Sequence, residues 1–306
     1  MALKIIFMGT TEFSVSILNA IYNSKHKILQ VYTQPPKRKN RGQKENFSPI
    51  YDFCIANKVM VKYPENLDTD KELKSITNLN PDVVVVVAYG KIIPSKLLEI
   101  KNLKFINVHA SLLPKWRGAA PIQRSIMNLD NETGISIMKI VPKLDAGPVL
   151  IKSKIKISKD TNYEKLSNEL SIVGSKLLLK SLDLIENKRD NFIDQDESQA
   201  TYAKKIEKSE AKINWNEKAK IILAKINALY PNPGSWFEYR GTRLKIIKAI
   251  EVKQNGKPGQ IINDKFTIAC SQHSIQIIEI KKEGKKRMLV SEYLRGNELI
   301  VGTNVS

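Results

Sequence analysis

The stretch PDVVVVVAYG, residues 81–90, has five consecutive valines at its centre. A run of β-branched residues without polar alternation is typical of a strand covered on both faces, as in the middle of a parallel sheet. Two further apolar runs, KIIFMG at 4–9 and KFINVH at 104–109, fit neighbouring strands. The valine run therefore predicts a fold organised around a central, buried strand.

Strand and helix patterns alternate on both sides of this run. We expect strands over residues 4–9, 28–34, 81–90, 104–109, 133–141 and 147–157, and helices over 12–24, 48–58, 94–100, 120–130 and 162–187. The helix over 48–58 has Ser48 as its N-cap and Pro49 at its first position. This alternation predicts an α/β domain with a doubly wound open sheet, in which ligands lie at the carboxyl ends of the strands.

The pattern changes near residue 190. Residues 190–200 are polar and acidic, residues 218–231 fit one helix, and short strand-like runs separated by Gly and Pro follow. We expect a first domain over 1–189, a linker over 190–207 and a small β-barrel domain over 208–306.

Charge is the most informative property of the composition. The 306 residues include 50 Lys and Arg against 31 Asp and Glu, a net charge of +19. Such a charge favours a polyanionic partner such as nucleic acid, although a lysine-rich composition that only maintains solubility is the alternative. No apolar run approaches the length of a membrane span, so no membrane partner is expected. Cys54 and Cys270 have no metal-ligand spacing and fit reduced packing residues of a cytoplasmic protein.

Asn107 and His109 occupy alternate positions at the end of the expected strand over 104–109. Their side chains should therefore point to the same side, where the chain leaves the sheet. A carboxylate would orient an active imidazole, and Asp145, in a turn between two strands, is the best candidate. A core histidine bonded to Asn107 is the alternative. His26 and His273 fit solvated bystanders.

Two further stretches could bind anions. Trp116 and Arg117, in SLLPKWRGAAPIQ, could stack on or pair with an anion, although core packing of Trp116 fits equally well. The loop TQPPKRKNRGQKENFSP, 33–49, is either a solvated basic loop or an arm that clamps phosphates. Its basic residues are Lys37, Arg38, Lys39, Arg41 and Lys44. By contrast, GTTEF after the first strand lacks two of the three glycines of a dinucleotide-binding turn, which disfavours a dehydrogenase.

Four motifs, NVHASLLPKWRGAAPIQ, VVVAYGKIIP, LDAGP and KIIFMGTTEF, resemble those of the methionyl-tRNA formyltransferase family, a branch of the folate-dependent formyltransferases. The likeness extends to the basic loop and to YPNPGSWFEYRGTRLKIIKA near the C-terminus. It implies a Rossmann-like domain followed by an OB-like barrel that binds tRNA. The implied reaction, part of translation initiation in protein biosynthesis, moves the formyl group of 10-formyltetrahydrofolate to the methionine α-amine of initiator methionyl-tRNA.

The resemblance also implies roles for individual residues. Asn107, His109 and Asp145 match the catalytic triad, and Arg41 and Lys44 lie in the loop that engages the tRNA acceptor end. The remaining basic residues of that loop, Lys37, Arg38 and Lys39, should contact the same RNA. The folate donor should be bound by the segment Ser111, Leu112, Leu113 and Pro114, and by Val87, Tyr89, Gly90 and Ile92. No metal is implied, and a monomer is the default.

Other functions fit the sequence less well. Formyl transfer to an amino sugar or to glycinamide ribonucleotide would need neither the basic loop nor the barrel. An RNA-binding protein built on an inactive enzyme scaffold would not need Asn107, His109 and Asp145 together. Thr11, Ala110 and Asn232 depart from the family pattern, but none of them lies in the expected catalytic triad.

Overall fold

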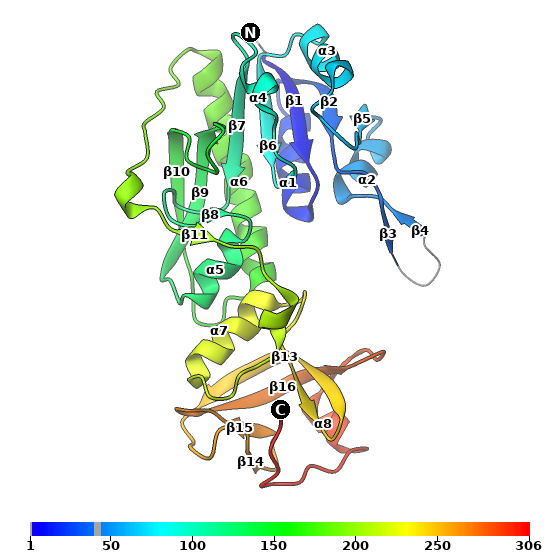
Figure 1. Ribbon diagram of the computed structural model, residues 1–306, viewed down its shortest axis with the longest axis vertical. Coiled ribbons are helices and arrows are strands. Elements are labelled where there is room, and N and C mark those ends of the chain that lie inside the picture. The colour runs from blue at the N-terminus through cyan, green and yellow to red at the C-terminus, as the bar shows by residue number, and fades with distance from the viewer. Residues whose placement is uncertain (1, 40–43) are drawn as a thin grey trace. The chain divides into compact units, whose positions relative to one another are not determined.

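A computed structural model describes residues 2–39 and 44–306, and two compact units divide the chain. The first unit comprises 1–118, 133–155 and 167–202, and the second comprises 119–132, 156–166 and 203–306. Figure 1 shows the elements of both. Across the described part of the chain, no helix combines the length and apolarity needed to cross a membrane.

The first unit is built on a seven-stranded sheet with the order β10-β9-β7-β6-β1-β2-β5. Its strands are β1 (Lys4–Gly9), β2 (Lys27–Tyr32), β5 (Val61–Lys62), β6 (Val83–Val87), β7 (Lys104–His109), β9 (Glu132–Lys139) and β10 (Val149–Lys156). The valine run is β6, in the fourth of the seven places, and all five valines are buried. The predicted central strand is confirmed.

The strands around β6 are parallel, because β1 pairs with β2 and β6, and β6 pairs with β7, in that sense. β9 pairs antiparallel with β7, with Lys139 opposite Ile106. The amide of Ile140 then donates to the carbonyl of Phe105. β9 thus ends beside the start of β7, so the chain must run back along β7 before it can reach the end of that strand.

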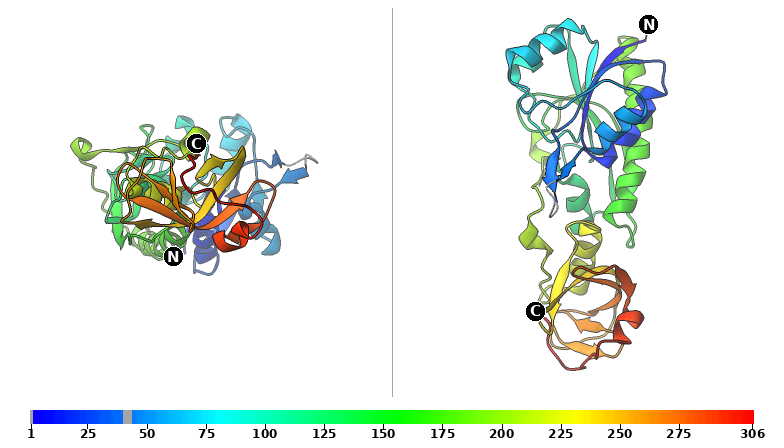
Figure 2. Two further views of the ribbon diagram at one scale, coloured as in Figure 1. Left: turned by 90° about the horizontal axis from the view of Figure 1, so that it is seen from below. Right: turned by 90° about the vertical axis from the view of Figure 1, so that its right-hand side faces the viewer.

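Helices cover both faces of this sheet (Figures 1 and 2). They are α1 (Glu12–Tyr22), α2 (Pro49–Ala56), α3 (Asp70–Asn78), α4 (Ser95–Leu98) and the long α6 (Tyr163–Glu186). On one face, Gly174 of α6 lies against Ile17 and Val108. On the other, Ile76 and Leu97 join the apolar cluster that includes Val84 and Val86. The Rossmann-like, doubly covered sheet is confirmed.

The predicted N-cap of α2 is also confirmed, because the Ser48 hydroxyl accepts from the amide of Tyr51. Helix α3 and the short β5 have no counterpart among the expected elements. Only Glu72 and Ile76 of α3 are buried, so its apolar signal is weak. His26 is 7 % exposed, and its Nδ1 accepts from the amide of Leu3, so the expectation that it is solvated is wrong.

The second unit is built on a curled antiparallel sheet with the order β12-β13-β16-β15-β14, and β17 also pairs with β16. These strands are β12 (Trp236–Tyr239), β13 (Thr242–Val252), β14 (Ile261–Asn263), β15 (Thr267–Ala269), β16 (Ser274–Lys282) and β17 (Arg287–Leu289). Irregular register between β13 and β16 near Lys248 increases the curvature. Buried side chains of α7 (Ala219–Leu229) and α8 (Val290–Leu294) complete its core. The predicted OB-like barrel is confirmed.

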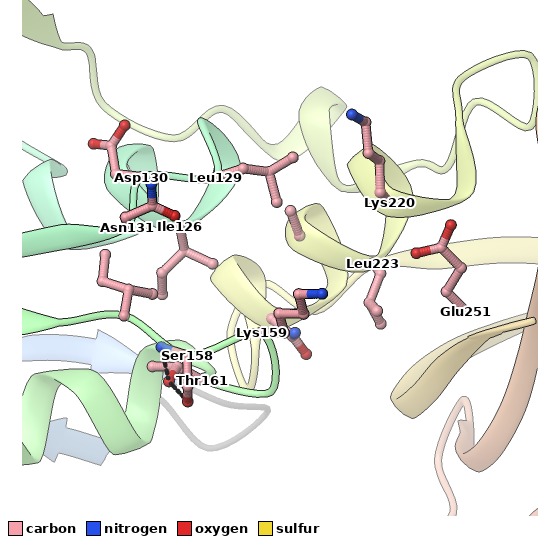
Figure 3. A pocket seen from close by; sticks show the side chains of 13 residues that line it. Ile126, Leu129, Asp130, Asn131, Ser158, Lys159, Thr161, Lys220, Leu223 and Glu251 are labelled. Atoms are coloured by element: carbon pink, nitrogen blue, oxygen red, sulfur yellow. Dashed lines mark hydrogen bonds between the residues drawn. The ribbon is translucent and has the colours of Figure 1, made fainter.

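The second unit also contains α5 (Pro121–Met127) and a pocket of about 320 Å³ (Figure 3). Apolar side chains such as Leu129 and Leu223 share its wall with Lys159, Lys220 and Glu251. None of the residues expected at the catalytic or folate-binding site lines this pocket.

Candidate active site

Asn107 and His109 both lie on β7, at its carboxyl end. Asn107 is in register with Val86 on one side and Met138 on the other, and His109 is opposite Ser136. Residues two apart on a strand share a face, so the amide and the imidazole emerge on the same side of the sheet. Asn107 is half-buried, whereas His109 is only 5 % exposed.

The imidazole of His109 makes one hydrogen bond and faces a carboxylate on its other side. Its Nε2 lies 2.9 Å from the carbonyl oxygen of Trp116, and its Nδ1 lies 3.7 Å from Oδ2 of Asp145. A carbonyl can only accept, so the hydrogen of the neutral ring is placed on Nε2. Nδ1 is then free to take a proton, and the facing carboxylate would stabilise the resulting cation.

Asp145 lies in the turn between β9 and β10. Its Oδ2 accepts a 2.8 Å hydrogen bond from the amide of Gly118, and its side chain is 17 % exposed. Its φ of +45° is in the left-handed region, which costs a non-glycine residue about 1–2 kcal/mol. Nearby, a Cβ on Gly147 would lie 1.8 Å from the carbonyl oxygen of Lys139, so the turn needs glycine there.

The segment 111–114 is tied to β9 by one buried hydroxyl. Ser136 accepts from the amide of Leu113 at 3.0 Å and donates to the carbonyl of Ser111 at 2.7 Å. The Lys152 ammonium donates to the carbonyl of Leu113. Leu113 is buried with Met138, while Leu112 and Pro114 stay half-buried. The apolar side chains at 112 and 114 are therefore the accessible part of this segment.

At the end of β6 and just after it, two carbonyls likewise accept side-chain hydrogen bonds. Val87 accepts from the Ser14 hydroxyl at 2.7 Å. Tyr89 accepts from the Thr10 hydroxyl at 2.9 Å and from the Gln34 amide at 2.8 Å. The ring of Tyr89 is 1 % exposed, and its burial raises the pKa of its hydroxyl. By contrast, Ile92 is 91 % exposed.

The basic loop begins and ends as a two-stranded antiparallel pair, β3 (Lys37–Lys39) and β4 (Lys44–Asn46). The pairing places Lys37 opposite Asn46, and Lys37 is exposed. Arg41 lies outside the described residues. Lys37, Arg38, Lys39 and Lys44 thus lie on two paired strands, which the irregular Gly- and Pro-containing sequence does not suggest.

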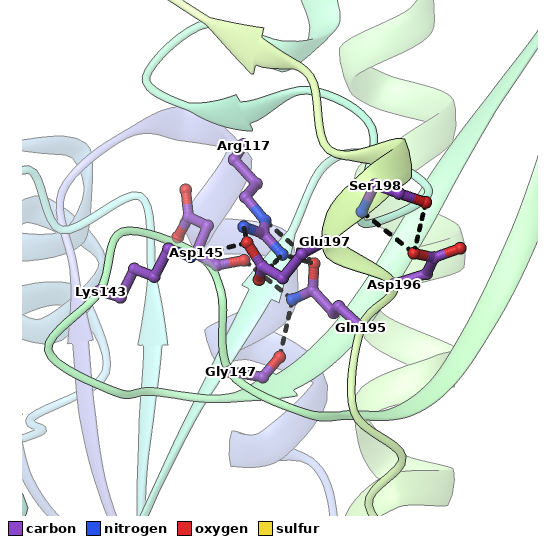
Figure 4. A network of polar contacts seen from close by, with 8 residues as sticks. All are labelled: Arg117, Lys143, Asp145, Gly147, Gln195, Asp196, Glu197 and Ser198. Carbon is purple, nitrogen blue, oxygen red and sulfur yellow. Dashed lines mark hydrogen bonds and ion pairs between the residues drawn. The ribbon is translucent and has the colours of Figure 1, made fainter.

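A polar network joins the Asp145 turn to residues from the expected linker (Figure 4). Arg117 is 0 % exposed, and its guanidinium donates to Gln195 and, through two nitrogens, to Glu197. Arg117 is therefore committed inside the protein, and the expectation that it pairs with a bound anion is wrong. Sequence reasoning did not identify Gln195 and Glu197 as its partners. The one available indication was Arg117, because a cation in an apolar, Ala- and Gly-rich stretch needs a carboxylate nearby.

Two matches identify the class to which this fold and site belong. Residues 3–182 match the formyl transferase family, and residues 205–298 match the formyl transferase C-terminal domain. The solved N-formyltransferase from Helicobacter canadensis, in complex with folinic acid and dTDP-3-aminofucose, is similar with a TM-score of 0.67. The two are 19% identical, over 92% of this chain and 100% of that one. The architecture is that of a formyl transferase.

Relatives of known name narrow the class. The methionyl-tRNA formyltransferase of Pelagibacter ubique is 47% identical over 100% of this chain and 99% of its own length. That of Paramagnetospirillum magneticum is 37% identical over 98% and 99%. The chain belongs to the methionyl-tRNA formyltransferase family, and the resemblance found in its motifs is confirmed.

Proposed function

We propose that this protein transfers the formyl group of 10-formyltetrahydrofolate to the α-amine of methionine on initiator methionyl-tRNA. Full-length similarity to relatives of that name is the observation that carries the proposal. The role is the start of translation, and the compartment is the cytoplasm, where translation starts. A monomer without a metal is sufficient for this chemistry.

The proposed mechanism assigns one task to each of three side chains. The amine attacks the formyl carbon, and the carbonyl oxygen gains negative charge. The half-buried amide of Asn107 donates a hydrogen bond to that oxygen. His109, whose Nδ1 faces Asp145, receives the proton that the amine loses. The bond between the formyl carbon and N10 of the folate then breaks, and His109 returns the proton to N10, which leaves as tetrahydrofolate. Asp145 orients the imidazole and stabilises its cationic form.

The donor is proposed to bind between the segment after β6 and the segment 111–114. The accessible apolar side chains of Leu112, Pro114 and Ile92 would pack on its rings. Val87 and Tyr89 are buried, so they would shape the floor of the site. Ser111 and Gly90 would contribute backbone groups, whereas Leu113, whose amide and carbonyl are bonded to Ser136 and Lys152, would anchor the segment.

The tRNA is proposed to bind through cations on both parts of the chain. The arm residues Lys37, Arg38, Lys39, Arg41 and Lys44 would contact the acceptor end, and the domain over 208–306 would contact other phosphates. The reaction would belong to the domain over 1–189, with 190–207 as the connection. A positive charge of this size supports binding through phosphates.

One assay tests the proposal directly. The purified protein is incubated with 10-formyltetrahydrofolate and, separately, initiator methionyl-tRNA, elongator methionyl-tRNA and a dTDP-amino sugar. We expect formyl transfer to the initiator tRNA at a rate at least about a hundredfold above that to the other acceptors. Transfer to the amino sugar with none to tRNA would overturn the proposal and favour a sugar N-formyltransferase. No transfer to any acceptor would favour a binding protein.

A further inference from the structure

Gln195 connects the chain that follows α6 to the turn that carries Asp145. Its side-chain amide donates to the carbonyl oxygen of Asp145 at 2.9 Å and to that of Gly147 at 2.7 Å. Figure 4 shows this amide between the turn and the guanidinium of Arg117. One side chain therefore holds two carbonyls of the same turn, one on each side of Ala146.

The orientation of the Gln195 amide is fixed by what surrounds it. Arg117 can only donate, and its Nε and Nη2 lie 3.1 and 2.9 Å from Oε1 of Gln195. The two carbonyls of the turn can only accept, so they require the NH₂ end. A glutamine satisfies both sides at once. A glutamate would keep the contact to Arg117 but would turn an oxygen toward two carbonyl oxygens.

Arg117 is itself held in place by a carboxylate. Glu197 accepts from Nη2 at 2.8 Å and from Nη1 at 3.1 Å, and Lys143 donates to Glu197 at 2.6 Å. Hydrogen bonds from Arg117 and then Lys143 lower the pKa of Glu197 to about 2. Glu197 is therefore charged throughout the neutral range, and the guanidinium stays fixed there.

The Asp145 turn needs such support. A residue held at φ +45° relaxes unless its surroundings over-determine its conformation. The Gly118 amide fixes the carboxylate, and Gln195 fixes the backbone. Together they set the 3.7 Å separation between Oδ2 of Asp145 and Nδ1 of His109.

We propose that Gln195, oriented by Arg117 and Glu197, is a positioning residue that sets the Asp145 carboxylate against His109. The inference rests on the proposed function in one respect, since it is that function that gives Asp145 a part in catalysis. Residues of the expected linker thus complete the active site of the first unit.

Gln195→Glu is the sharpest test of this proposal. We expect kcat to fall about tenfold to a hundredfold, while KM for the folate donor and for methionyl-tRNA changes less than about threefold, because the carboxylate is misplaced and the substrates still bind. The matched control is Asp196→Asn, which changes a charge on the next residue. Among the residues that the structure describes, the Asp196 carboxylate bonds only within its own turn, to Ser198 and Gln199, and Asn retains that capping role. If Gln195→Glu does not fold, Gln195→Ala removes the same donors without adding charge.

A double-mutant cycle separates positioning from general loss of structure. In an Asp145→Asn background, Gln195→Glu should lower kcat by less than about twofold further, because no carboxylate remains to be placed. Equal effects in both backgrounds would overturn the proposal, as would wild-type kcat in Gln195→Glu.

A third measurement does not depend on the reaction. Hydrogen exchange of the Gly118 amide, which donates to Asp145, should quicken about tenfold or more in Gln195→Glu and stay unchanged in Asp196→Asn. Unchanged exchange in Gln195→Glu would overturn the positioning role. If the wild type formylates no tRNA but exchange responds as expected, the proposed substrate fails and the positioning role stands.

Discussion

Asn107 and His109 differ in how much of their hydrogen-bonding capacity is already used inside the protein. His109 is bonded to Trp116 and faces Asp145, so its orientation is set before any substrate binds. Asn107 is half-buried on the same strand face. Within residues 2–39 and 44–306 its side-chain amide has no hydrogen-bond partner, so it can direct its NH₂ group at a substrate oxygen without first breaking a hydrogen bond to them.

Replacement of this amide is the first prediction. Asn107→Ala should lower kcat about a hundredfold to a thousandfold, or about 3–4 kcal/mol, because the oxyanion would lose the donor proposed for it. The melting temperature should stay within a few degrees. Asn78→Ala, on the exposed end of α3, is the control and should behave as wild type. Single-turnover rates with saturating donor measure the effect, and a wild-type rate for Asn107→Ala would remove the amide from the mechanism.

The two cysteines give a second prediction at this scale. Cys54 and Cys270 are free and buried, as the sequence indicated. Burial raises the pKa of both thiols to about 12, from 9.0. The protonated thiols therefore stabilise the fold fully below about pH 9, and this contribution is lost as the pH rises from about 9 to about 12.

Urea unfolding at pH 8 and at pH 10 measures this loss. The midpoint should fall between these pH values by more in the wild type than in Cys54→Ala with Cys270→Ala. In the native protein at pH 8, a disulfide reagent should leave both thiols unmodified for minutes, whereas in denaturant it should titrate two per chain. Rapid native modification would contradict the burial of these side chains.

At the scale of elements, Ser136 of β9 anchors the segment 111–114. Ser136→Ala removes the acceptor for the amide of Leu113 and leaves that buried donor unpaired. We expect a loss of about 1–3 kcal/mol in the free energy of unfolding. KM for the folate donor should rise more than KM for tRNA, because the proposed donor-binding segment loosens.

Chemical denaturation and steady-state kinetics measure both effects. Ser153→Ala, on the neighbouring strand β10, is the matched control and should change neither quantity. An unchanged KM for folate in Ser136→Ala, with the expected loss of stability, would separate this segment from donor binding.

The sequence predicted most of the elements but not the path of the chain between β9 and β10. The spacing of apolar residues and the length of apolar runs identify β6, β7 and α6. Burial on both faces of a strand, or on one face of a helix, requires apolar residues at those positions. They do not reveal that β9 is antiparallel to β7 and ends beside Phe105. The strand ends near the start of β7, yet Asp145 reaches His109 at its end. This return depends on hydrogen bonds from Gly118 and Gln195, which are remote in sequence.

The same limit applies to the site residues. Asn107 and His109 stand out because polar side chains are unusual at the end of a buried strand. Gln195 and Glu197 alternate in the sequence with Asp194 and Asp196. Composition alone cannot show which of these polar side chains contact Arg117 and which are solvated. Only the fold brings Arg117 to them.

At the scale of the whole molecule, the property that leads to a prediction is the net charge of +19. We expect kcat/KM for methionyl-tRNA to fall about tenfold to a thousandfold between about 50 mM and 200 mM salt, because phosphate contacts release counterions. KM for the folate donor should change far less. A salt response equal for both substrates would contradict tRNA capture by phosphate contacts.

The arm can be tested separately from the total charge. Arg41→Ala with Lys44→Ala should raise KM for methionyl-tRNA about tenfold and leave KM for folate unchanged, since the acceptor end would lose the two cationic contacts proposed for it. Lys71→Ala with Lys101→Ala removes the same charge at exposed positions elsewhere and is the control. Equal effects of the two double substitutions would mean that the arm acts only through the general positive charge of the protein.

The buried position of Arg117 determines where this polypeptide tolerates being cut. A version shortened to residues 1–189 would lack Gln195, Glu197 and Thr201, so Arg117 would lose its counter-charge, the side chain that shares its guanidinium and the carbonyl that accepts from its amide. One that continues to Tyr202 would retain the ion pair and the whole first unit. Proteolysis or subcloning aimed at an isolated N-terminal half should therefore recover folded material only when the acidic tail beyond α6 is kept.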